Sequence, residues 1–368
     1  MSSKILKKNT VLNETILQYV QSLDLEEDLK KIQQVKKKQP KIDLLINSYI
    51  RHAFKKLNFH NNELNKCSNT DYCRQKLQEK QIPLSKLYWI QLLTQIVVKY
   101  DYQETDVKVL LEELMIQLPF YHIELSLMER VGNNLIKLMK DESTSTIIQL
   151  LFSSNLMSKW YESSVTYQVF YKYIKEAIKI LINSRIESTI NVLEVGSGTG
   201  GLTTHLLPLF EPKQTKYVFT DISNYFLRLG AKKYANYPFI DYKILDLEKD
   251  CIDQRYTKSS FDIILANNVI HDTKNILFTL YNLRKLLKPN GFLILLELTD
   301  PQIWWHMCFG SLEGWWRFKM DDNDKREEIM LLTKKQWVSI LEEAGFSQTV
   351  AIADDLKQEF ANCVFIAT

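Results

Sequence analysis

The sequence predicts an α/β protein in which a mostly parallel β-sheet follows a helical first part of the chain. The first observation is the distribution of glycine: the 368 residues hold ten glycines, and none precedes Gly132. Helix interiors disfavour glycine, so its absence favours helices there. The second is that short apolar segments alternate with amphipathic ones from residue 190 onward. That alternation is typical of parallel strands joined by right-handed helical crossovers.

Helical periodicity supports the first half of this division. In residues 42–57, "IDLLINSYIRHAFKKL", apolar side chains recur on one face of a helix. The same periodicity occurs in residues 84–100, 107–118 and 164–182. We expect residues 1–150 to form a helical lid or docking region and residues 151–368 to form the domain that contains the sheet.

Apolar segments in the second part predict the strands in order. The predicted strands are residues 190–196, 216–221, 240–246, 261–268, 291–298, 349–353 and 362–368. The predicted helices are residues 201–210, 223–234, 274–287 and 334–345. The connection at 299–332 contains four tryptophans, Trp304, Trp305, Trp315 and Trp316. It is too long and too aromatic for a simple loop, so we predict a functional insertion there.

Composition argues against several classes of protein. The net charge is only +3, so binding to nucleic acid is not predicted. No run of about 18 apolar residues occurs, and the first residues lack the apolar core of a signal peptide, so we expect a cytoplasmic protein without membrane contact. The five cysteines are odd in number and include no C-x-x-C pair, which predicts buried thiols rather than disulfides or a metal site.

Positive charge is concentrated near the N-terminus. Residues 1–60 hold 12 Lys and Arg against 6 Asp and Glu, a net charge of +6. The run "KKKQPK" at residues 36–41 is part of this excess. We predict that this run is a solvated loop or linker; a docking surface for an acidic partner is the alternative.

The segment "VLEVGSGTGG", residues 192–201, is a predicted strand that leads through a glycine turn into a helix. Glycine lets a backbone approach a ligand closely, and a helix N-terminus offers free amides. Glu194 lies at the end of this strand, Asp221 ends the next and Asp246 ends the third. No P-loop lysine follows, which disfavours triphosphates. Acidic groups at successive strand ends favour a ligand with ribose hydroxyls and positive charge.

His271 follows the fourth strand of the predicted sheet, and Glu297 closes the fifth. Ligands of open α/β sheets bind at the carboxyl ends of the strands, so we expect these two side chains within hydrogen-bond reach. A carboxylate on one imidazole nitrogen fixes the tautomer and raises the basicity of the other. Such a pair suits removal of a proton from a weakly acidic carbon or hydroxyl. A purely structural His–Glu hydrogen bond is the alternative.

Four motifs in order, "LEVGSGTGG", Asp221, "LDLEKD" and "ANNVIH", resemble those of class I S-adenosylmethionine-dependent methyltransferases. The resemblance implies a Rossmann-like, mixed but mostly parallel sheet of seven strands, with S-adenosylmethionine as cofactor. The candidate cofactor-binding residues lie at the ends of the first four strands: Glu194, Gly196, Gly198, Gly200, Asp221, Asp246, Leu247, Asn267 and Asn268. By resemblance, the glycines line the methionine part, Asp221 holds the ribose, the 246–247 pair flanks the adenine, and one of the two asparagines lies near the methionine end. A related fold that binds another nucleotide, or none, is the alternative.

A narrower resemblance covers residues 120–368. "VIHDT", "LLELTDP", "LEGWWRF" and "KWYESS" are similar to motifs of the C-methyltransferase domain of polyketide synthases. In that family a His–Glu pair deprotonates the α-carbon of a β-ketoacyl thioester on an acyl carrier protein, and the enolate takes the methyl group. The resemblance implies that His271 and Glu297 are this pair and that Tyr161 borders the active site. The implied partner is a carrier protein with a β-ketoacyl phosphopantetheine, and neighbouring polyketide synthase modules are further candidates.

Several alternatives stay open at this point. The chain is expected to be an excised domain or an enzyme that works in trans. An O- or N-methyltransferase for a free small molecule would share the cofactor motifs, and a non-catalytic module would share the fold. The tryptophans predict either a core cluster or a wall of an acyl or phosphopantetheine tunnel, with Arg317 as a polar group. His205 is expected to pack, and His306 is a lesser candidate for contact with substrate.

Overall fold

The computed structural model describes residues 12–20, 22–100, 105–152, 154–184, 189–300, 302–321, 324, 326, 329–352 and 362–368. The chain forms two compact units. We call residues 1–26, 161–300 and 317–368 the sheet unit, and residues 27–160 and 301–316 the helical unit. The sequence predicts a boundary after residue 150, whereas the division falls after residue 160 and assigns part of the aromatic insertion to the helical unit.

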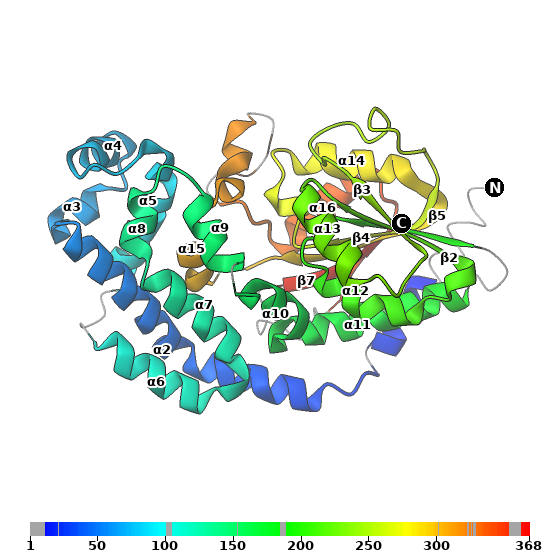
Figure 1. The fold of residues 1–368 in the computed structure, drawn as a ribbon, viewed down its shortest axis with the longest axis horizontal. Helices are drawn as coiled ribbons and strands as arrows, with labels where there is room; N and C mark the ends of the chain where they lie inside the picture. Colours follow the sequence, from blue (N-terminus) through cyan, green and yellow to red (C-terminus); the bar gives the residue numbers. More distant parts are fainter. Residues whose placement is uncertain are drawn as a thin grey trace. The chain divides into compact units, whose positions relative to one another are not determined.

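The sheet unit is built on seven strands in the order β3–β2–β1–β4–β5–β7–β6. Figure 1 labels β2, β3, β4, β5 and β7 among them. Strands β1 to β5 run parallel to one another, and β7 pairs antiparallel with β5 and β6. The strands are β1 Ile190–Val195, β2 Thr215–Asp221, β3 Ile240–Ile244, β4 Phe261–Asn267, β5 Leu287–Leu298, β6 Thr349–Ile352 and β7 Asn362–Ala367. The predicted mixed, mostly parallel seven-stranded fold is confirmed. The strand order reverses between β1 and β4, which is where such sheets bind ligands.

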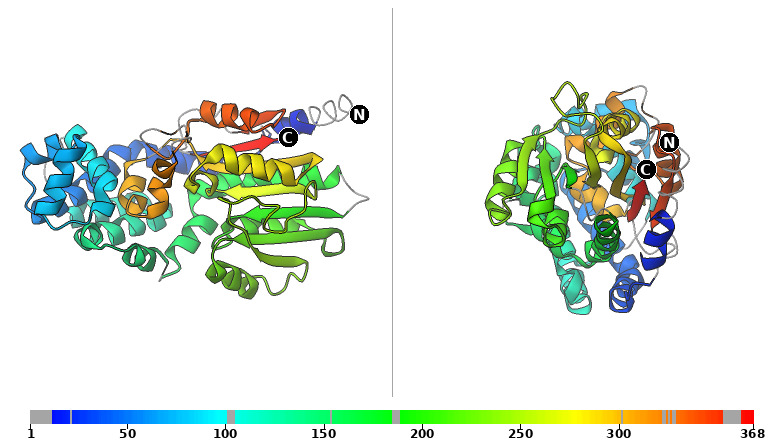
Figure 2. Two further views of the ribbon diagram at one scale, coloured as in Figure 1. Left: turned by 90° about the horizontal axis from the view of Figure 1, so that it is seen from above. Right: turned by 90° about the vertical axis from the view of Figure 1, so that its right-hand side faces the viewer.

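Helices cover this sheet: α11 Val165–Asn183, α12 Gly201–Leu206, α13 Asn224–Lys233, α14 Ile276–Leu286 and α16 Lys334–Glu343. Helices α14 and α16 lie side by side (yellow and orange-red in Figure 2). Leu193, Ile264 and Leu295 of the sheet share one buried cluster with Leu283 of α14 and Leu341 of α16. Successive residues of a strand point to opposite faces of the sheet. Each strand end therefore has side chains on both faces.

The helical unit is a set of short helices after one long one. Its helices are α2 Glu26–Lys56, α3 Asn61–Lys66, α4 Thr70–Glu79, α5 Leu87–Lys99, α6 Val107–Gln117, α7 His122–Gly132, α8 Leu135–Lys140, α9 Ser145–Phe152, most of α10 Leu156–Ser163, and α15 Ile303–Phe309. Gly132 ends α7 against Tyr49 of α2, where a Cβ would lie 2.5 Å from the ring. Glycine at this position therefore allows the two helices to approach closely.

The aromatic insertion contributes α15 to this unit, where it packs on α5 and α7. Trp89 of α5 donates its indole N–H to the main-chain oxygen of His306 at 2.9 Å. Trp304 and Trp305 are buried and their rings meet edge to face, with centroids 5.5 Å apart. The tryptophans of α15 are therefore core residues of the helical unit, which agrees with the predicted core cluster rather than with a tunnel wall.

The prediction of a loop or linker at residues 36–41 is wrong. The run lies inside helix α2, which continues through Pro40. Proline removes one main-chain donor and disfavours a helix interior. The buried residues Ile32, Val35, Ile42 and Leu45 lie on both sides of the run at helical spacing. Burial of this continuous apolar face outweighs the local cost of the proline and the repulsion among the lysines.

Most predicted elements agree with the structure to within a few residues. Strand β5 begins at Leu287, earlier than predicted, and α12 ends at Leu206 with a 3₁₀ turn at Leu207–Leu209. The last residue of the predicted strand 349–353 lies outside the described residues. The five cysteines are free and buried, as predicted. Among the described residues, no helix combines the length and apolarity needed to cross a membrane.

Candidate active site

His271 and Glu297 meet at the carboxyl ends of β4 and β5, as the topology predicts. The Nδ1 atom of His271 lies 2.5 Å from Oε2 of Glu297. Both side chains are buried, with exposed fractions of 6% for His271 and 0% for Glu297. The other carboxylate oxygen, Oε1, accepts the main-chain N–H of Ile270 at 2.9 Å and of Val269 at 3.3 Å. The carboxylate thus fixes both the ring and the turn that carries it.

The electrostatics of this pair favour a proton on the imidazole. Burial alone would lower the pKa of His271, but the adjacent Glu297 charge and its hydrogen bond more than offset this, so the pKa of His271 is raised. Because Nδ1 faces Glu297, Nε2 is the ring nitrogen left to exchange a proton with a substrate. A buried base with a raised pKa suits the removal of a proton from carbon.

The glycine loop leaves room for a ligand where the sequence predicts one. Gly196, Gly198 and Gly200 have φ values of +56°, +52° and +74°, in the left-handed region. A Cβ on Gly196 would lie 2.2 Å from Val269, whereas a Cβ on Gly198 would meet nothing closer than 3.9 Å. Gly198 is therefore the place where the loop backbone lies open. Its N–H donates to Oδ2 of Asp221 at 3.0 Å.

The two asparagines at the end of β4 are held by tyrosines of α11. Asn267 Nδ2 donates to the hydroxyl of Tyr171 at 3.0 Å, and Asn268 Nδ2 donates to that of Tyr167 at 2.9 Å. Asn268 has a φ of +50°, a left-handed conformation that asparagine tolerates better than most residues. No motif of the sequence predicted a role for these two tyrosines. Their spacing of four residues was visible, but it indicated only the buried face of a helix.

Tyr161 lies at the end of α10, and its main chain packs against the loop. A Cβ on Gly201 would lie 2.7 Å from Tyr161 Cβ. Burial raises the pKa of the Tyr161 phenol well above its usual value, and the charges of Asp272 and Glu297 raise it further. The phenol is thus neutral and within the electrostatic reach of the Glu297 carboxylate. A neutral phenol at this position can donate a hydrogen bond to an oxygen that gains negative charge.

The three acidic residues at the strand ends differ in their surroundings. Glu194 is buried, and its Oε2 accepts hydrogen bonds from Thr203 at 2.6 Å and Tyr217 at 2.7 Å. Burial raises the pKa of Glu194 to about 7. Asp221 accepts main-chain N–H groups of Gly198 and Ser223, and burial raises its pKa.

Asp246 differs from the other two in its pairing with a lysine. Burial would raise the pKa of Asp246, but Lys249, 2.9 Å away, and the N–H of Glu248 lower it. Leu247, the next residue, belongs to the buried cluster beneath α14 and α16. These two residues therefore place one charged and one apolar side chain at the end of the third strand.

The remaining candidates have structural partners. His205 Nε2 lies 2.7 Å from the main-chain oxygen of Glu162, and its ring packs against Tyr171. Arg317 pairs with Glu248 at 3.5 Å. His306 is buried in the helical unit, where its ring meets Trp315 edge to face. The structure therefore gives each of these three a packing or pairing role.

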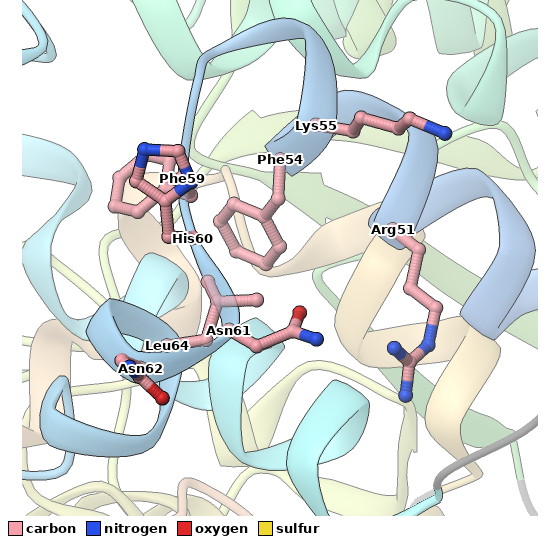
Figure 3. A pocket seen from close by; sticks show the side chains of 8 residues that line it. All are labelled: Arg51, Phe54, Lys55, Phe59, His60, Asn61, Asn62 and Leu64. Atoms are coloured by element: carbon pink, nitrogen blue, oxygen red, sulfur yellow. The ribbon is translucent and has the colours of Figure 1, made fainter.

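A separate hollow of about 500 Å³ lies in the helical unit (Figure 3). Phe54, Phe59 and Leu64 form its apolar part, and Arg51 lies at its side. The Arg51 guanidinium donates to the main-chain oxygens of Val97 at 2.9 Å and Tyr100 at 3.3 Å. Arg51 thus ties α2 to the end of α5, and its donors are engaged within the protein.

Comparisons with known proteins agree with this geometry. The profile of a family described as "Methyltransferase domain" matches residues 193–293. The polyketide synthase–nonribosomal peptide synthetase pyiS of Pyricularia grisea is 34% identical over 244 residues, which are 66% of this chain and 6% of that protein. The reducing polyketide synthase BOA6 of Botryotinia fuckeliana is 32% identical over 281 residues, which are 74% of this chain and 11% of that protein. The chain therefore spans a small part of the length of these relatives.

Solved structures extend the likeness to both units. The CurJ carbon methyltransferase is 26% identical, with a TM-score of 0.82 over 99% of this chain and 98% of that one. The chain is similar to the C-methyltransferase domains of polyketide synthases. The citrinin polyketide synthase CMeT domain, 22% identical with a TM-score of 0.76 over 100% of this chain and 96% of its own, has the same fold. This C-methyltransferase is thus an enzyme whose cofactor is S-adenosylmethionine.

The residues of this C-methyltransferase fit that cofactor. Thr199 Oγ1 and Asn268 Oδ1 are buried and have no hydrogen-bond partner among the described residues. Buried polar atoms are rarely left without a partner, and both belong to the segments around the open backbone of Gly198. S-adenosylmethionine carries an ammonium group and ribose hydroxyls that such atoms and the Asp221 carboxylate can bind. The donor set therefore suits a cationic nucleoside better than a polyphosphate.

Proposed function

We propose that this protein transfers a methyl group to the α-carbon of a β-ketoacyl thioester held by an acyl carrier protein, in polyketide biosynthesis. The observation that carries the proposal is the buried 2.5 Å contact between His271 and Glu297 at the ends of β4 and β5. An O- or N-methyltransferase with an already nucleophilic substrate has less need of a buried, carboxylate-oriented base. The relatives include polyketide synthases, which supports the same class of substrate.

The proposed reaction begins with proton removal by His271. The α-proton lies between two carbonyl groups, so Nε2 of His271 accepts it and an enolate forms. Glu297 stays ionised and stabilises the imidazolium through Nδ1. Tyr161 is the proposed donor to the enolate oxygen, because its phenol is neutral and close to the charge of Glu297. S-adenosylmethionine, when bound, supplies the electrophilic methyl group that the enolate carbon takes.

The cofactor-binding residues follow from the open loop and the strand ends. Gly196, Gly198 and Gly200 would admit the methionine part beside Asn267 or Asn268, and Asp221 would bind the ribose hydroxyls. Asp246 and Leu247 would flank the adenine. Glu194 would support the loop from beneath, since its carboxylate holds Thr203 of α12 and Tyr217 of β2. Binding and orientation by these groups would supply much of the rate enhancement as proximity.

The proposed partner is an acyl carrier protein, free or within a neighbouring polyketide synthase module. Residues 1–60 carry a net charge of +6, which suits an acidic partner surface. A binding constant that weakens as salt rises is expected for such a contact. The cytoplasm is the proposed location.

The experiment that tests the proposal is intact-mass spectrometry of an acetoacetyl-loaded carrier protein after incubation with the enzyme and S-adenosylmethionine. A gain of one methylene mass, placed at the α-carbon by loss of exchangeable deuterium, is the expected result. His271→Ala should abolish the gain while retaining S-adenosylmethionine binding in a titration. Methylation of a free alcohol or amine in place of the carrier substrate would overturn the proposal. Cofactor binding that never leads to methylation would indicate a non-catalytic module.

A further inference from the structure

Arg326 is a buried arginine in the last part of the aromatic insertion, and no motif of the sequence predicted a role for it. Its side chain is 1% exposed. Arg326 pairs with Asp324 through Nε at 2.6 Å and Nη2 at 3.0 Å, and the Asp324 side chain is 3% exposed. Such a two-point pair is the strong form of an arginine–carboxylate contact. Both residues belong to the sheet unit.

The remaining donors of this guanidinium hold the turn that carries His271. Nη1 donates to the main-chain oxygen of His271 at 2.6 Å, and Nη2 donates to that of Thr273 at 2.6 Å. Longer bonds reach the oxygens of Lys274 and Met330, each at 3.2 Å. The planar guanidinium therefore binds three carbonyls of residues 271–274 at once, which a lysine ammonium cannot reproduce in the same geometry.

Asp324, the partner of Arg326, also binds the first residue of helix α14. Oδ2 of Asp324 accepts the main-chain N–H of Ile276, the first residue of α14, at 3.3 Å. Asp321 Oδ2 accepts Asn275 Nδ2 at 3.2 Å. The last part of the aromatic insertion thus fixes both the His271 turn and the start of the helix that follows it. Glu297 separately accepts the N–H of Ile270 and contacts the ring of His271.

We propose that Arg326, held by Asp324, is a positioning residue that fixes the main chain of His271 so that its ring keeps the orientation needed for proton transfer. This inference rests on the proposed role of His271 as base. A carboxylate on the ring and a guanidinium on the main chain together fix the base at two points. Catalytic groups lose activity when their supporting contacts allow displacements of about 0.5 Å or more.

The charge of Arg326 gives the proposal a second consequence. The charged groups that act on the His271 ring are Glu297, Asp272 and Arg326, and Asp324 pairs with Arg326. Among them the Glu297 and Asp272 charges raise the pKa of His271, and the Arg326 charge lowers it. Removal of the Arg326 charge should therefore shift the titration of His271 to higher pH, while its replacement by lysine should largely preserve the pH at which His271 titrates.

The test compares Arg326→Lys and Arg326→Gln with the wild-type enzyme. With a carrier-bound β-ketoacyl substrate, we expect kcat to fall by about tenfold to a hundredfold in both variants, with the Kd for S-adenosylmethionine changed less than about threefold. The pH at which kcat reaches half its maximum should rise in Arg326→Gln. Guanidinium ion should restore part of the activity of Arg326→Gly. Arg228→Lys, an exposed arginine on α13, is the matched control and should match the wild type.

A readout that needs no turnover separates this inference from the proposed function. The imidazole resonance of His271, assigned by its loss in His271→Asn, can be titrated by NMR in each variant. We expect its titration to move upward in Arg326→Gln even if the enzyme methylates some other substrate. Asp324→Asn, which keeps the arginine and weakens its partner, serves if Arg326→Gln does not fold. Unchanged kcat and unchanged titration in folded variants would overturn the proposal.

Discussion

The imidazole of His271 lies 2.5 Å from the carboxylate of Glu297, and neither side chain has appreciable contact with solvent. The strand pairing explains this contact. Asn267 of β4 is in register with Leu296 of β5, so the residues just after these positions come together at the carboxyl ends of the strands. The contact therefore depends on the sheet and not on a local motif.

Glu297→Gln should slow the reaction and shift its pH dependence. The amide retains a hydrogen bond but loses the charge that raises the pKa of His271. The base then titrates at lower pH, so the acid limb of the kcat profile should move down while maximal kcat falls by about tenfold to a thousandfold. Measurement of kcat from pH 5 to 9 checks this. Glu342→Gln, on the exposed end of α16, is the control; an unmoved acid limb in Glu297→Gln would contradict the prediction.

Gly198→Ala should weaken cofactor binding more than it weakens the fold. The Cβ would enter the open space above the loop, and its φ of +52° adds a strain of about 1–2 kcal/mol. We expect the Kd for S-adenosylmethionine to rise at least about tenfold. Gly345→Ala is the matched control, since Gly345 also has a positive φ and open space around it. Isothermal titration of S-adenosylmethionine into both variants measures this effect. Equal losses of affinity in the two variants would contradict the prediction.

Glu194→Gln should remove a pH dependence of stability. The pKa of Glu194 is about 7 in the folded protein, above its ordinary value of 4.5. Its contribution to the free energy of unfolding is therefore complete below about pH 4.5 and is lost as pH rises through 7. The full loss is about 3.5 kcal/mol, from about 2.5 pKa units at about 1.4 kcal/mol each. Urea denaturation at pH 5 and 8 should show a smaller difference in the variant than in the wild type. Identical differences would argue against a protonated Glu194.

His306→Phe should make the helical unit more resistant to unfolding at low pH. Burial lowers the pKa of His306 to about 4 from an ordinary 6.5. A neutral histidine stabilises the fold above pH 6.5, and that contribution is lost as pH falls toward 4, by about 3 kcal/mol. Tryptophan fluorescence can follow unfolding, since Trp315 packs on this ring. His52→Gln, at an exposed position on α2, is the control. Equal acid sensitivity of the His306 variant and the wild type would count against the prediction.

The sequence predicted the parts of the site that strand order determines. His271, Glu297, Asp221 and the glycine loop lie at strand ends, and alternating strands and helices already place such ends together. Arg326 was not predicted, because it acts through main-chain oxygens distant in sequence and no side-chain pattern reports them. The prediction of a loop at the lysine run 36–41 was wrong because it relied on local composition, which is typical of a linker. The apolar residues on both sides of the run determine the helix instead.

The five buried thiols provide a built-in reporter of how the protein opens. Cys67, Cys73 and Cys308 belong to the helical unit, and Cys251 and Cys363 belong to the sheet unit. A thiol reagent can modify a buried cysteine only when the surrounding structure opens. Labelling rates resolved by peptide mass would therefore measure local opening of each unit in the unmodified enzyme. Because Cys363 lies within β7, its labelling rate would also measure how often β7 separates from β5 and β6.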